Sequence, residues 1–329
     1  MGITPDDVMV KAVSQWDVAP AGIVTIRPAK VLSGQIDRIR GAEFGSIEDV
    51  VRDFIGGFDS PQPPTRAFRL TQILLMDGAL YAGNAVRHLK PRSGRFPMGF
   101  APRETACTSM YESWVGNRWF GNWLLDDCLT YRLAEQAGRP VATTLATGHQ
   151  PAYERQLGIE PTRKTSAFFE ELILFDDRSH NEGKRDRATN LRRRLIGSEP
   201  ARHPGVYLLR GSSGARRVLR NERTIAEHLA TRRGFQVLDP TIADLETIVR
   251  ACAGADVIAG VEGSHLVHGL MMMPPSARAL VIQPPGRAVS VLKLMTDRQG
   301  QDYSFVVGVG NNEVFDASVG EIERTLDLA

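Results

Sequence analysis

The stretch Val206–Gln283 decides the fold. It begins VYLLRGSSGARRVLRNERTIAEHL and ends ADVIAGVEGSHLVHGLMMMPPSARALVIQ. Short β-branched runs alternate in it with helical segments, which is the pattern of a parallel sheet covered by helices. We predict strands at 206–209, 235–238, 256–261 and 279–283. Helices are predicted at about 222–233, from Thr241 to about Cys252, and after Glu262.

Two glycine-bearing turns follow strands of this predicted sheet, GSSG at 211–214 and EGSH at 262–265. Parallel sheets of this kind bind ligands at the carboxyl ends of their strands. Arg210, Arg217 and the N–H groups of Gly263 and Ser264 at a helix start should gather at that edge. Arginine side chains and unpaired N–H groups together suit a phosphate or a diphosphate.

Length and composition indicate an ordinary globular protein with two domains. The chain has 329 residues, of which 42% are hydrophobic and 24% charged. We place the domain boundary near Ser198–Gly205, which gives domains 1–200 and 201–329. A net charge of +2 does not argue for nucleic acid as a partner. Arginine makes up 34 of the 40 basic residues, but only placement, and not abundance, would indicate phosphate binding.

Several features favour a cytoplasmic protein. No run of about 18 apolar residues is present, and the N-terminus lacks the basic and apolar regions of a signal peptide. Three widely spaced cysteines (Cys107, Cys128 and Cys252) are typical of reduced thiols.

Residues 184–194 hold six basic side chains and one acidic one, which predicts a solvated linker helix. The alternative is a basic patch for an anionic acceptor or for the inner face of a membrane. The sequence gives no signal for the oligomeric state.

The first half also reads as α/β, with an antiparallel addition. FRLTQILLMDGALYAGNAV at 68–86 predicts a β-hairpin turning at Asp77-Gly78. Helices are predicted at 119–136 and 151–157, and strands at 141–145 and 168–175. The last residues predict a strand, an Asn-rich turn and a closing helix.

Three blocks of the second half resemble glycosyltransferase family 61: YLLRGSSGARRVLRNE at 207–222, GFQVLDP at 234–240 and AGVEGSHLVHGLMMMPP at 259–275. In the first half, GNWLLDDCLTYRL at 121–133 resembles the family's His–Trp–x–x–Asp/Glu helix, and YERQLGI at 153–159 follows it. The resemblance covers about Phe68 to Leu328. Family 61 consists of inverting nucleotide-sugar transferases, and the chain is similar to them over this range.

The chain departs from the family pattern at several positions. Glu262 stands where most members have His, and Asn122 replaces the His of the first-half motif. Ser264 and His265 replace two small residues, and His268 stands where Asn is usual. These changes leave room for a different donor or acceptor, or for a protein that binds without turnover.

The resemblance implies a GT-B-like α/β fold, in which two Rossmann-like domains face across a cleft, here with the β-hairpin added to the N-terminal half. It implies that domain 201–329 binds the nucleotide sugar and that domain 1–200 receives the acceptor. The expected enzyme is a hexosyl- or pentosyl-transferase of surface polysaccharide biosynthesis. We expect a UDP-linked donor, a glycan or lipid-linked acceptor, and no metal ion or other cofactor.

The resemblance also assigns donor-binding residues, namely Arg210, Arg217, Asn221, Gly263, Ser264 and His265. Arg210 is the first choice for the diphosphate and Arg217 the second. The alternative for each is a surface arginine paired with Glu222 or another acid, which would contribute little. Asn221 and Glu222 have the alternative role of capping and orienting the helix that follows.

For the catalytic base we favour Asp126, and Glu262 is the second catalytic candidate. Asp127 should point about 100° away from Asp126 on a helix and face solvent. Glu262 has two other readings, a ligand of the ribose hydroxyls or a helix-capping carboxylate. Together with His265 and His268 it would form a metal site at spacings of three, but the usual two-His helix site uses a spacing of four. Asp176-Asp177 is expected in a loop at a strand end.

Two other functions compete with transfer. A non-catalytic protein that binds nucleotide or sugar phosphate would explain Asn122 and Glu262. A dinucleotide-dependent oxidoreductase is disfavoured, because no GxGxxG follows a strand.

Overall fold

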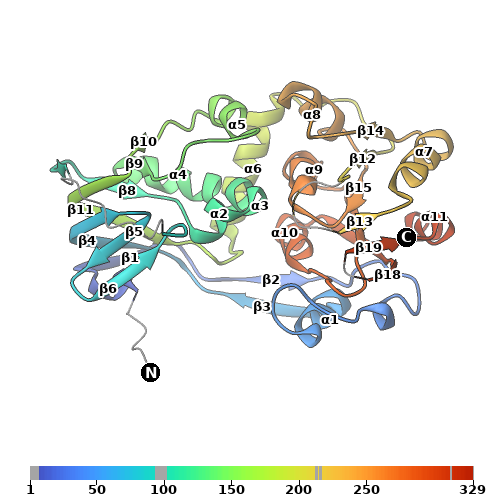
Figure 1. Cartoon of the computed structure of the whole chain (residues 1–329), viewed down its shortest axis with the longest axis horizontal. Helices are drawn as coiled ribbons and strands as arrows, with labels where there is room; N and C mark the ends of the chain where they lie inside the picture. The colour runs from blue at the N-terminus through green and yellow to red at the C-terminus, as the bar shows by residue number, and fades with distance from the viewer. Residues whose placement is uncertain (1–6, 93–101, 212–213, 215–216, 312, 329) are drawn as a thin grey trace. The chain divides into compact units, whose positions relative to one another are not determined.

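The computed structural model describes residues 7–92, 102–211, 214, 217–311 and 313–328, and it is a mixed α/β structure, as predicted (Figure 1). Its contacts divide the chain into two compact units. Unit 1 comprises Met1–Gly22 and Gln62–Leu191, and unit 2 comprises Ile23–Pro61 and Arg192–Ala329. The division therefore differs from the predicted domains 1–200 and 201–329, because residues 23–61 belong with the second half of the chain.

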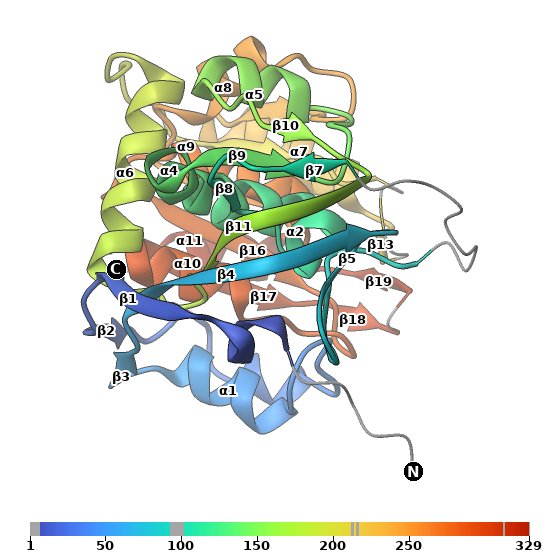
Figure 2. The ribbon, with the colours of Figure 1, turned by 90° about the vertical axis from the view of Figure 1, so that its left-hand side faces the viewer.

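Unit 1 is built on a nine-stranded mixed sheet in the order β10-β9-β8-β11-β4-β5-β6, with β1 beside β4 and β7 beside β11. The strands β7, β8, β9, β10 and β11 run parallel to one another, whereas β1, β4, β5 and β6 pair antiparallel. Figure 2 shows the two longest strands, β4 and β11, crossing the sheet side by side. The strands of this sheet are β1 Ser14–Ala19, β4 Thr65–Met76, β5 Ala79–Ala82, β6 Ala85–His88, β7 Arg103–Glu104, β8 Thr108–Met110, β9 Arg139–Ala142, β10 Thr162–Arg163 and β11 Ser166–Asp176.

The predicted hairpin is confirmed. Strands β4 and β5 pair through Met76 and Ala79, so that Asp77 and Gly78 form a two-residue turn. Both turn residues have positive φ, 47° and 69°, which is the backbone of a type I′ turn. The Asp77-Gly78 pair therefore correctly predicted the position and the type of this turn.

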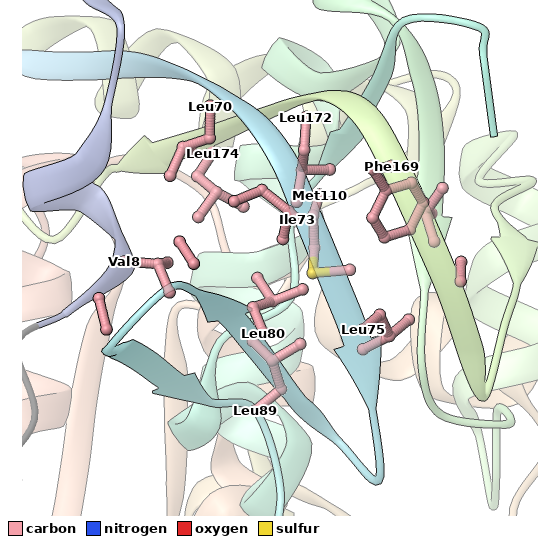
Figure 3. Packing of buried hydrophobic residues seen from close by; sticks show 14 residues of the cluster. Val8, Leu70, Ile73, Leu75, Leu80, Leu89, Met110, Phe169, Leu172 and Leu174 are labelled. Atoms are coloured by element: carbon pink, nitrogen blue, oxygen red, sulfur yellow. The ribbon is translucent and has the colours of Figure 1, made fainter. Parts of the chain in front are cut away.

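The core of unit 1 lies against this sheet (Figure 3). Leu70, Ile73 and Leu75 of β4 pack with Leu80 of β5 and Phe169 of β11, all fully buried. Each such side chain stabilises the fold by about 1.5–3 kcal/mol relative to exposure. The helical elements are η1 Val8–Lys11, α2 Trp114–Arg118, α3 Phe120–Asn122, η3 Trp123–Asp127, α4 Cys128–Ala137, α5 Gln150–Leu157 and α6 Glu182–Ile196, of which the last five residues belong to unit 2. The predicted helix 119–136 thus contains a π turn, η3.

Unit 2 contains a five-stranded sheet, parallel throughout, in the order β14-β12-β15-β16-β17. In chain order this is 2-1-3-4-5, a doubly wound arrangement. The strands are β12 Val206–Leu208, β14 Gln236–Leu238, β15 Val257–Val261, β16 Arg278–Gln283 and β17 Asp302–Val307. The first four agree with the predicted strands to within about one residue at each end. Helices α7 and α11 lie on one side of the sheet, and α9 and α10 on the other (Figure 1).

The helices of unit 2 are η2 Ile36–Arg38, α1 Ile47–Ile55, α7 Glu222–Arg233, α8 Leu245–Cys252, η4 Ser264–Leu266, α9 Val267–Met272, α10 Val291–Gln299 and α11 Val319–Leu326. The α7 bounds equal the predicted ones. The start predicted for the next helix is wrong, because Asp244 and not Thr241 is the N-cap of α8. The Asp244 carboxylate accepts the Thr247 N–H at 2.8 Å. Helix α10 was not predicted.

Residues 23–61 attach to unit 2 through tertiary contacts. Lys30 forms a parallel bridge with Ser304 of β17, and the Phe54 ring of α1 stacks on Phe305 at 4.3 Å between centroids. The segment begins with strand β2 Gly22–Ile26 and ends with strand β3 Phe58–Gln62, and these two strands pair in a small sheet. A further small sheet joins β13 Val218–Leu219, β19 Val314–Asp316 and β18 Val309–Gly310. Contacts over such sequence separations leave no local pattern, and so the sequence did not indicate them.

Candidate functional site

The carboxyl edge of the unit 2 sheet has a topological switch point between β12 and β15. These two strands are direct neighbours (Figure 1), but β12 is followed by a connection to β14 and β15 by a connection to β16, on the opposite side. Loops that diverge in this way leave a crevice where such folds bind ligands. Arg210 lies two residues after β12, and Glu262 follows β15 directly. The fold therefore places both predicted site residues at this point.

The turn after β12 is held by Glu222, the first residue of α7. One carboxylate oxygen accepts the Arg210 N–H and the other the Gly211 N–H, both at 2.8 Å. Burial raises the pKa of Glu222, and these two hydrogen bonds oppose the shift. Glu222 thus orients the turn before α7, whereas the alternative role considered for it was to cap and orient the helix itself. Ser212, Ser213, Ala215 and Arg216 of the GSSGARR turn lie outside the described residues.

The Arg210 guanidinium lies against two glycines. A Cβ on Gly263 would be 2.1 Å from Nη1, and a Cβ on Gly214 would be 3.2 Å from Nη2. Gly263 has φ of 155°, a conformation that favours glycine. Burial, followed by the nearby charge of Arg217, lowers the pKa of Arg210 to about 10. A cation this poorly solvated is stabilised by an added anion.

Arg217 and Glu262 form a buried ion pair, with 2.8 Å between Nη1 and Oε2. Both side chains are less than a tenth exposed. Burial lowers the pKa of Arg217 and raises that of Glu262, while each group's charge opposes the shift of the other. Glu262, predicted as a catalytic candidate, is therefore placed as the counterion of a predicted phosphate ligand.

A third arginine of this edge, Arg287, was missed by the sequence analysis. It lies in the loop after β16, and its Nη2 is 2.6 Å from Glu43 Oε1. Its charge contributes to lowering the pKa of both Arg210 and Arg217. The signal available was a Pro-Pro-Gly turn after a predicted strand with an arginine beside it, much as Arg210 precedes Gly211.

The other predicted donor ligands differ in their surroundings. Asn221 is engaged at both ends of its amide: Nδ2 donates to the Ala317 carbonyl at 2.7 Å, and Oδ1 accepts the Ala317 N–H at 3.2 Å. It makes no side-chain cap for α7. Gly263 and Ser264 lie where η4, a 3-10 turn, begins. Both ring nitrogens of half-buried His265 are enclosed, and burial, followed by the charge of Arg210, lowers its pKa well below the usual value. Both effects favour the neutral form of the His265 ring.

Asp126 lies in unit 1, on the π turn η3. Its Oδ1 is 2.6 Å from Nζ of Lys184, a lysine whose side chain is 1% exposed, and Asn122 Nδ2 donates to Oδ2 at 3.0 Å. The predicted base is thus an oriented, ion-paired carboxylate. Asn122, the residue that departs from the family pattern, takes part directly in orienting it.

The prediction that Asp127 faces solvent is wrong. Asp127 is 2% exposed and accepts the N–H and the hydroxyl of Ser113 at 3.1 and 2.7 Å. Burial raises its pKa well above the usual value. The angular spacing used for the prediction holds for an α-helix, and it does not apply unchanged within a π turn.

The basic helix α6 is less solvated than predicted. Besides Lys184, Arg187 pairs with Asp177 at 2.6 Å, and Arg192 Nε donates to the Met272 carbonyl at 2.9 Å. Asp177 lies in the loop directly after β11, as expected, but its side chain is buried, at 7% exposed. Lys184, Arg187 and Arg192 are therefore engaged within the fold, and Arg185 pairs with Glu182 on the helix itself, which leaves a smaller cationic surface than the sequence suggested.

Two kinds of site are absent from the described residues. No group of three or more His, Cys, Asp or Glu side chains in this part of the chain is arranged to hold a metal ion. Within the same residues, no helix has the length and hydrophobicity needed to cross a membrane.

Comparison with known proteins gives one family. The sequence model of the Glycosyltransferase 61 family matches residues 78–280, which include Asp126, Arg210, Arg217 and Glu262. No curated protein matches significantly. Among solved structures, the metal-soaked Flv1 flavodiiron core from Synechocystis sp. PCC6803 is similar over 80% of this chain, with 11% identity and a TM-score of 0.28. This chain spans 62% of that one, and a likeness this weak carries no argument.

Proposed function

Because the chain belongs to the glycosyltransferase 61 family, we propose that it transfers a sugar from a nucleotide-sugar donor to a hydroxyl group of a glycan or glycoconjugate acceptor, with inversion. Family membership implies glycosyltransferase activity, with a donor and an acceptor of these general classes. The finer assignment is ours: a UDP-linked donor, a glycan or lipid-linked acceptor, and surface polysaccharide synthesis at the cytoplasmic side of a membrane. We further assign the two units to the GT-B class, with the donor on unit 2 and the acceptor on unit 1.

The observation that carries this proposal is the pair Arg210 and Arg217 at the switch point. Transfer requires stabilisation of the charge that grows on the departing nucleoside diphosphate. Fixed guanidinium groups supply it, and bidentate hydrogen bonding makes arginine suited to phosphate oxygens. Gly263 and the ring of His265 lie beside Arg210, and we assign them to the donor site together with the N–H groups of Gly263 and Ser264.

The proton of the acceptor hydroxyl must be removed as its oxygen attacks the anomeric carbon. The bond from that carbon to the phosphate oxygen breaks, the diphosphate leaves with the electron pair, and the proton passes to a carboxylate. We assign this base to Asp126, which Lys184 and Asn122 orient. Glu262, the second candidate, is better suited to holding Arg217. In this scheme arginines, and not a resident metal, neutralise the diphosphate.

The test uses the purified protein with a panel of UDP-, GDP-, CMP- and dTDP-sugars. Calorimetry measures binding, and release of nucleoside diphosphate measures hydrolysis or transfer. We expect saturable binding of one nucleotide class and slow hydrolysis of its sugar. Neither binding nor hydrolysis across the panel would overturn the proposal.

A second candidate function is binding of a nucleotide sugar or sugar phosphate without catalysis. The specific observation in its favour is that both candidate bases, Asp126 and Glu262, are ion-paired. This function predicts donor binding with no transfer to any acceptor. It also predicts that Asp126→Asn changes stability alone.

A further inference from the structure

Backbone hydrogen bonds join segment 23–61 to the loop that follows β16. Arg40 N–H donates to the Pro285 carbonyl at 2.7 Å, and Ala288 N–H donates to the Gly41 carbonyl at 2.9 Å. Glu43 N–H donates to the Ala288 carbonyl at 3.2 Å. Backbone bonds of this kind fix the register of the two segments, so Glu43 is held opposite Arg287.

The two backbones meet too closely for any side chain at position 41. A Cβ on Gly41 would lie 2.4 Å from the Gly286 carbonyl oxygen, a backbone atom that has no room to move aside. Glycine at 41 therefore allows the approach that places Glu43 beside Arg287. The result is a defined ion pair, 2.6 Å between Arg287 Nη2 and Glu43 Oε1, with both side chains about a quarter exposed.

The Arg287 guanidinium retains hydrogen-bonding capacity. Its Nε is buried and has no hydrogen-bond partner among the residues that the structure describes. Its charge acts on Arg210, Arg217 and Glu262, so it belongs to the same electrostatic cluster at the switch point. A buried donor left without a partner is costly, and a ligand oxygen would satisfy it.

The guanidinium groups of the cluster keep further donors for an anion. Three carboxylates (Glu43, Glu222 and Glu262) balance the three guanidinium charges, but Arg217 Nε, like Arg287 Nε, is buried and has no hydrogen-bond partner among the described residues. An anion that accepts several charge-assisted hydrogen bonds would satisfy such donors. A diphosphate offers oxygens on two phosphorus atoms for three guanidinium groups.

We propose that Arg287 is a third ligand of the donor diphosphate, and that Glu43 of the N-terminal segment is its positioning residue. The inference rests on the proposed function of this site and extends it. Neither residue lies within 78–280, so the donor site reaches beyond the part of the chain that the family model matches. Residues before and after that part then jointly complete it.

The test measures dissociation constants for inorganic pyrophosphate and for UDP by calorimetry. Arg287→Gln should weaken pyrophosphate binding by about tenfold or more, as expected for loss of a charge-assisted hydrogen bond. The matched control is Arg202→Gln, which removes an ion-paired arginine at the opposite edge of the same sheet, where Nε lies 2.8 Å from Asp256. It should leave both constants unchanged, and thermal melts verify that each variant is folded.

The outcomes separate this inference from the proposed function. If Arg210→Gln abolishes pyrophosphate binding while Arg287→Gln binds like the wild type, the third-ligand inference is overturned and the proposed function stands. If the wild-type protein binds neither UDP nor pyrophosphate, both are overturned.

Glu43 is tested by a double-mutant cycle in the same assay. As a positioning residue it acts only through Arg287, so Glu43→Gln should weaken pyrophosphate binding several-fold in the wild-type background and have no effect in Arg287→Gln. An equal change in both backgrounds would show that the Glu43 charge acts on the anion directly, and would overturn its positioning role.

Discussion

Nη1 of Arg210 lies 2.1 Å from the point where a Cβ of residue 263 would be. The arginine therefore needs glycine at this position, and the φ of 155° at Gly263 adds a second reason. A backbone feature after β15 thus decides where a side chain after β12 can rest. This dependence gives the candidate site its first sharp test.

Gly263→Ala should displace the Arg210 guanidinium and strain the backbone by about 1–3 kcal/mol. We expect UDP binding to weaken by about tenfold or more. Calorimetry measures the affinity, and a thermal melt measures the strain. Gly22→Ala is the control, since a Cβ added there would meet no atom within 4 Å. Unchanged UDP affinity in Gly263→Ala would contradict the proposed location of the diphosphate.

Neutralising the two arginines of the switch point should act on the phosphates and not on the nucleoside. Arg210→Gln and Arg217→Gln should each weaken UDP binding by about tenfold, and leave the weaker binding of uridine unchanged. Arg220→Gln serves as the control, because Arg220 is exposed and paired with Asp316. Equal losses for UDP and uridine would indicate a general disruption of the fold instead.

The roles of Asp126 in stability and in catalysis can be separated. Asp126→Asn leaves the buried Lys184 ammonium without its counterion, which should destabilise unit 1 by about 3–5 kcal/mol. Adding Lys184→Met removes that charge and should restore much of the stability measured by urea unfolding. Transfer should remain lost in the double variant if Asp126 is the base. Recovery of transfer together with stability would assign the carboxylate a structural role alone.

Because its carboxyl group loses a proton, Asp127 should make the free energy of unfolding fall as pH rises. Burial raises its folded-state pKa above the unfolded value, so the folded protein holds more protons between the two values. Its contribution is therefore fully present below the ordinary aspartate pKa and is lost as pH climbs toward the raised one. Asp127→Asn should remove this slope. Urea unfolding from about pH 4 to about pH 8 measures it, and an unaltered slope in the variant would assign it to other groups.

Transfer should be insensitive to chelation, because the proposed diphosphate ligands are guanidinium groups. We expect the same initial rate in EDTA as in Mg²⁺ or Mn²⁺, after exhaustive dialysis. A rate that collapses in EDTA and returns with one cation would require a metal ion at the donor site.

Local chemistry explains which parts of this structure the sequence predicted. Helix α7 ends as predicted because Gly234 adopts a left-handed conformation just past its last turn. The turn at Asp77-Gly78 has the same kind of local cause. Arg210 and Glu262 could be placed at one edge, since both follow strands of a parallel sheet.

The remaining features depend on side-chain contacts that no sequence motif indicates. Ser113, 14 residues before Asp127, donates its N–H and its hydroxyl to the buried Asp127 carboxylate. Arg287 is positioned by Glu43, which lies 244 residues before it, so that no window of sequence holds this pair. The π turn beneath Asp126 likewise follows from packing, since its residues read as an ordinary helix.

The discontinuous make-up of unit 2 has a consequence for synthesis on the ribosome. Residues 23–61 emerge about 250 residues before their partners Ser304 and Phe305, which belong to β17. Phe54 cannot pack against Phe305 until β17 has been translated. If the nascent chain is released before β17 is made, this apolar segment has no β17 to pack against. Truncated products should therefore be prone to aggregation and to binding by chaperones.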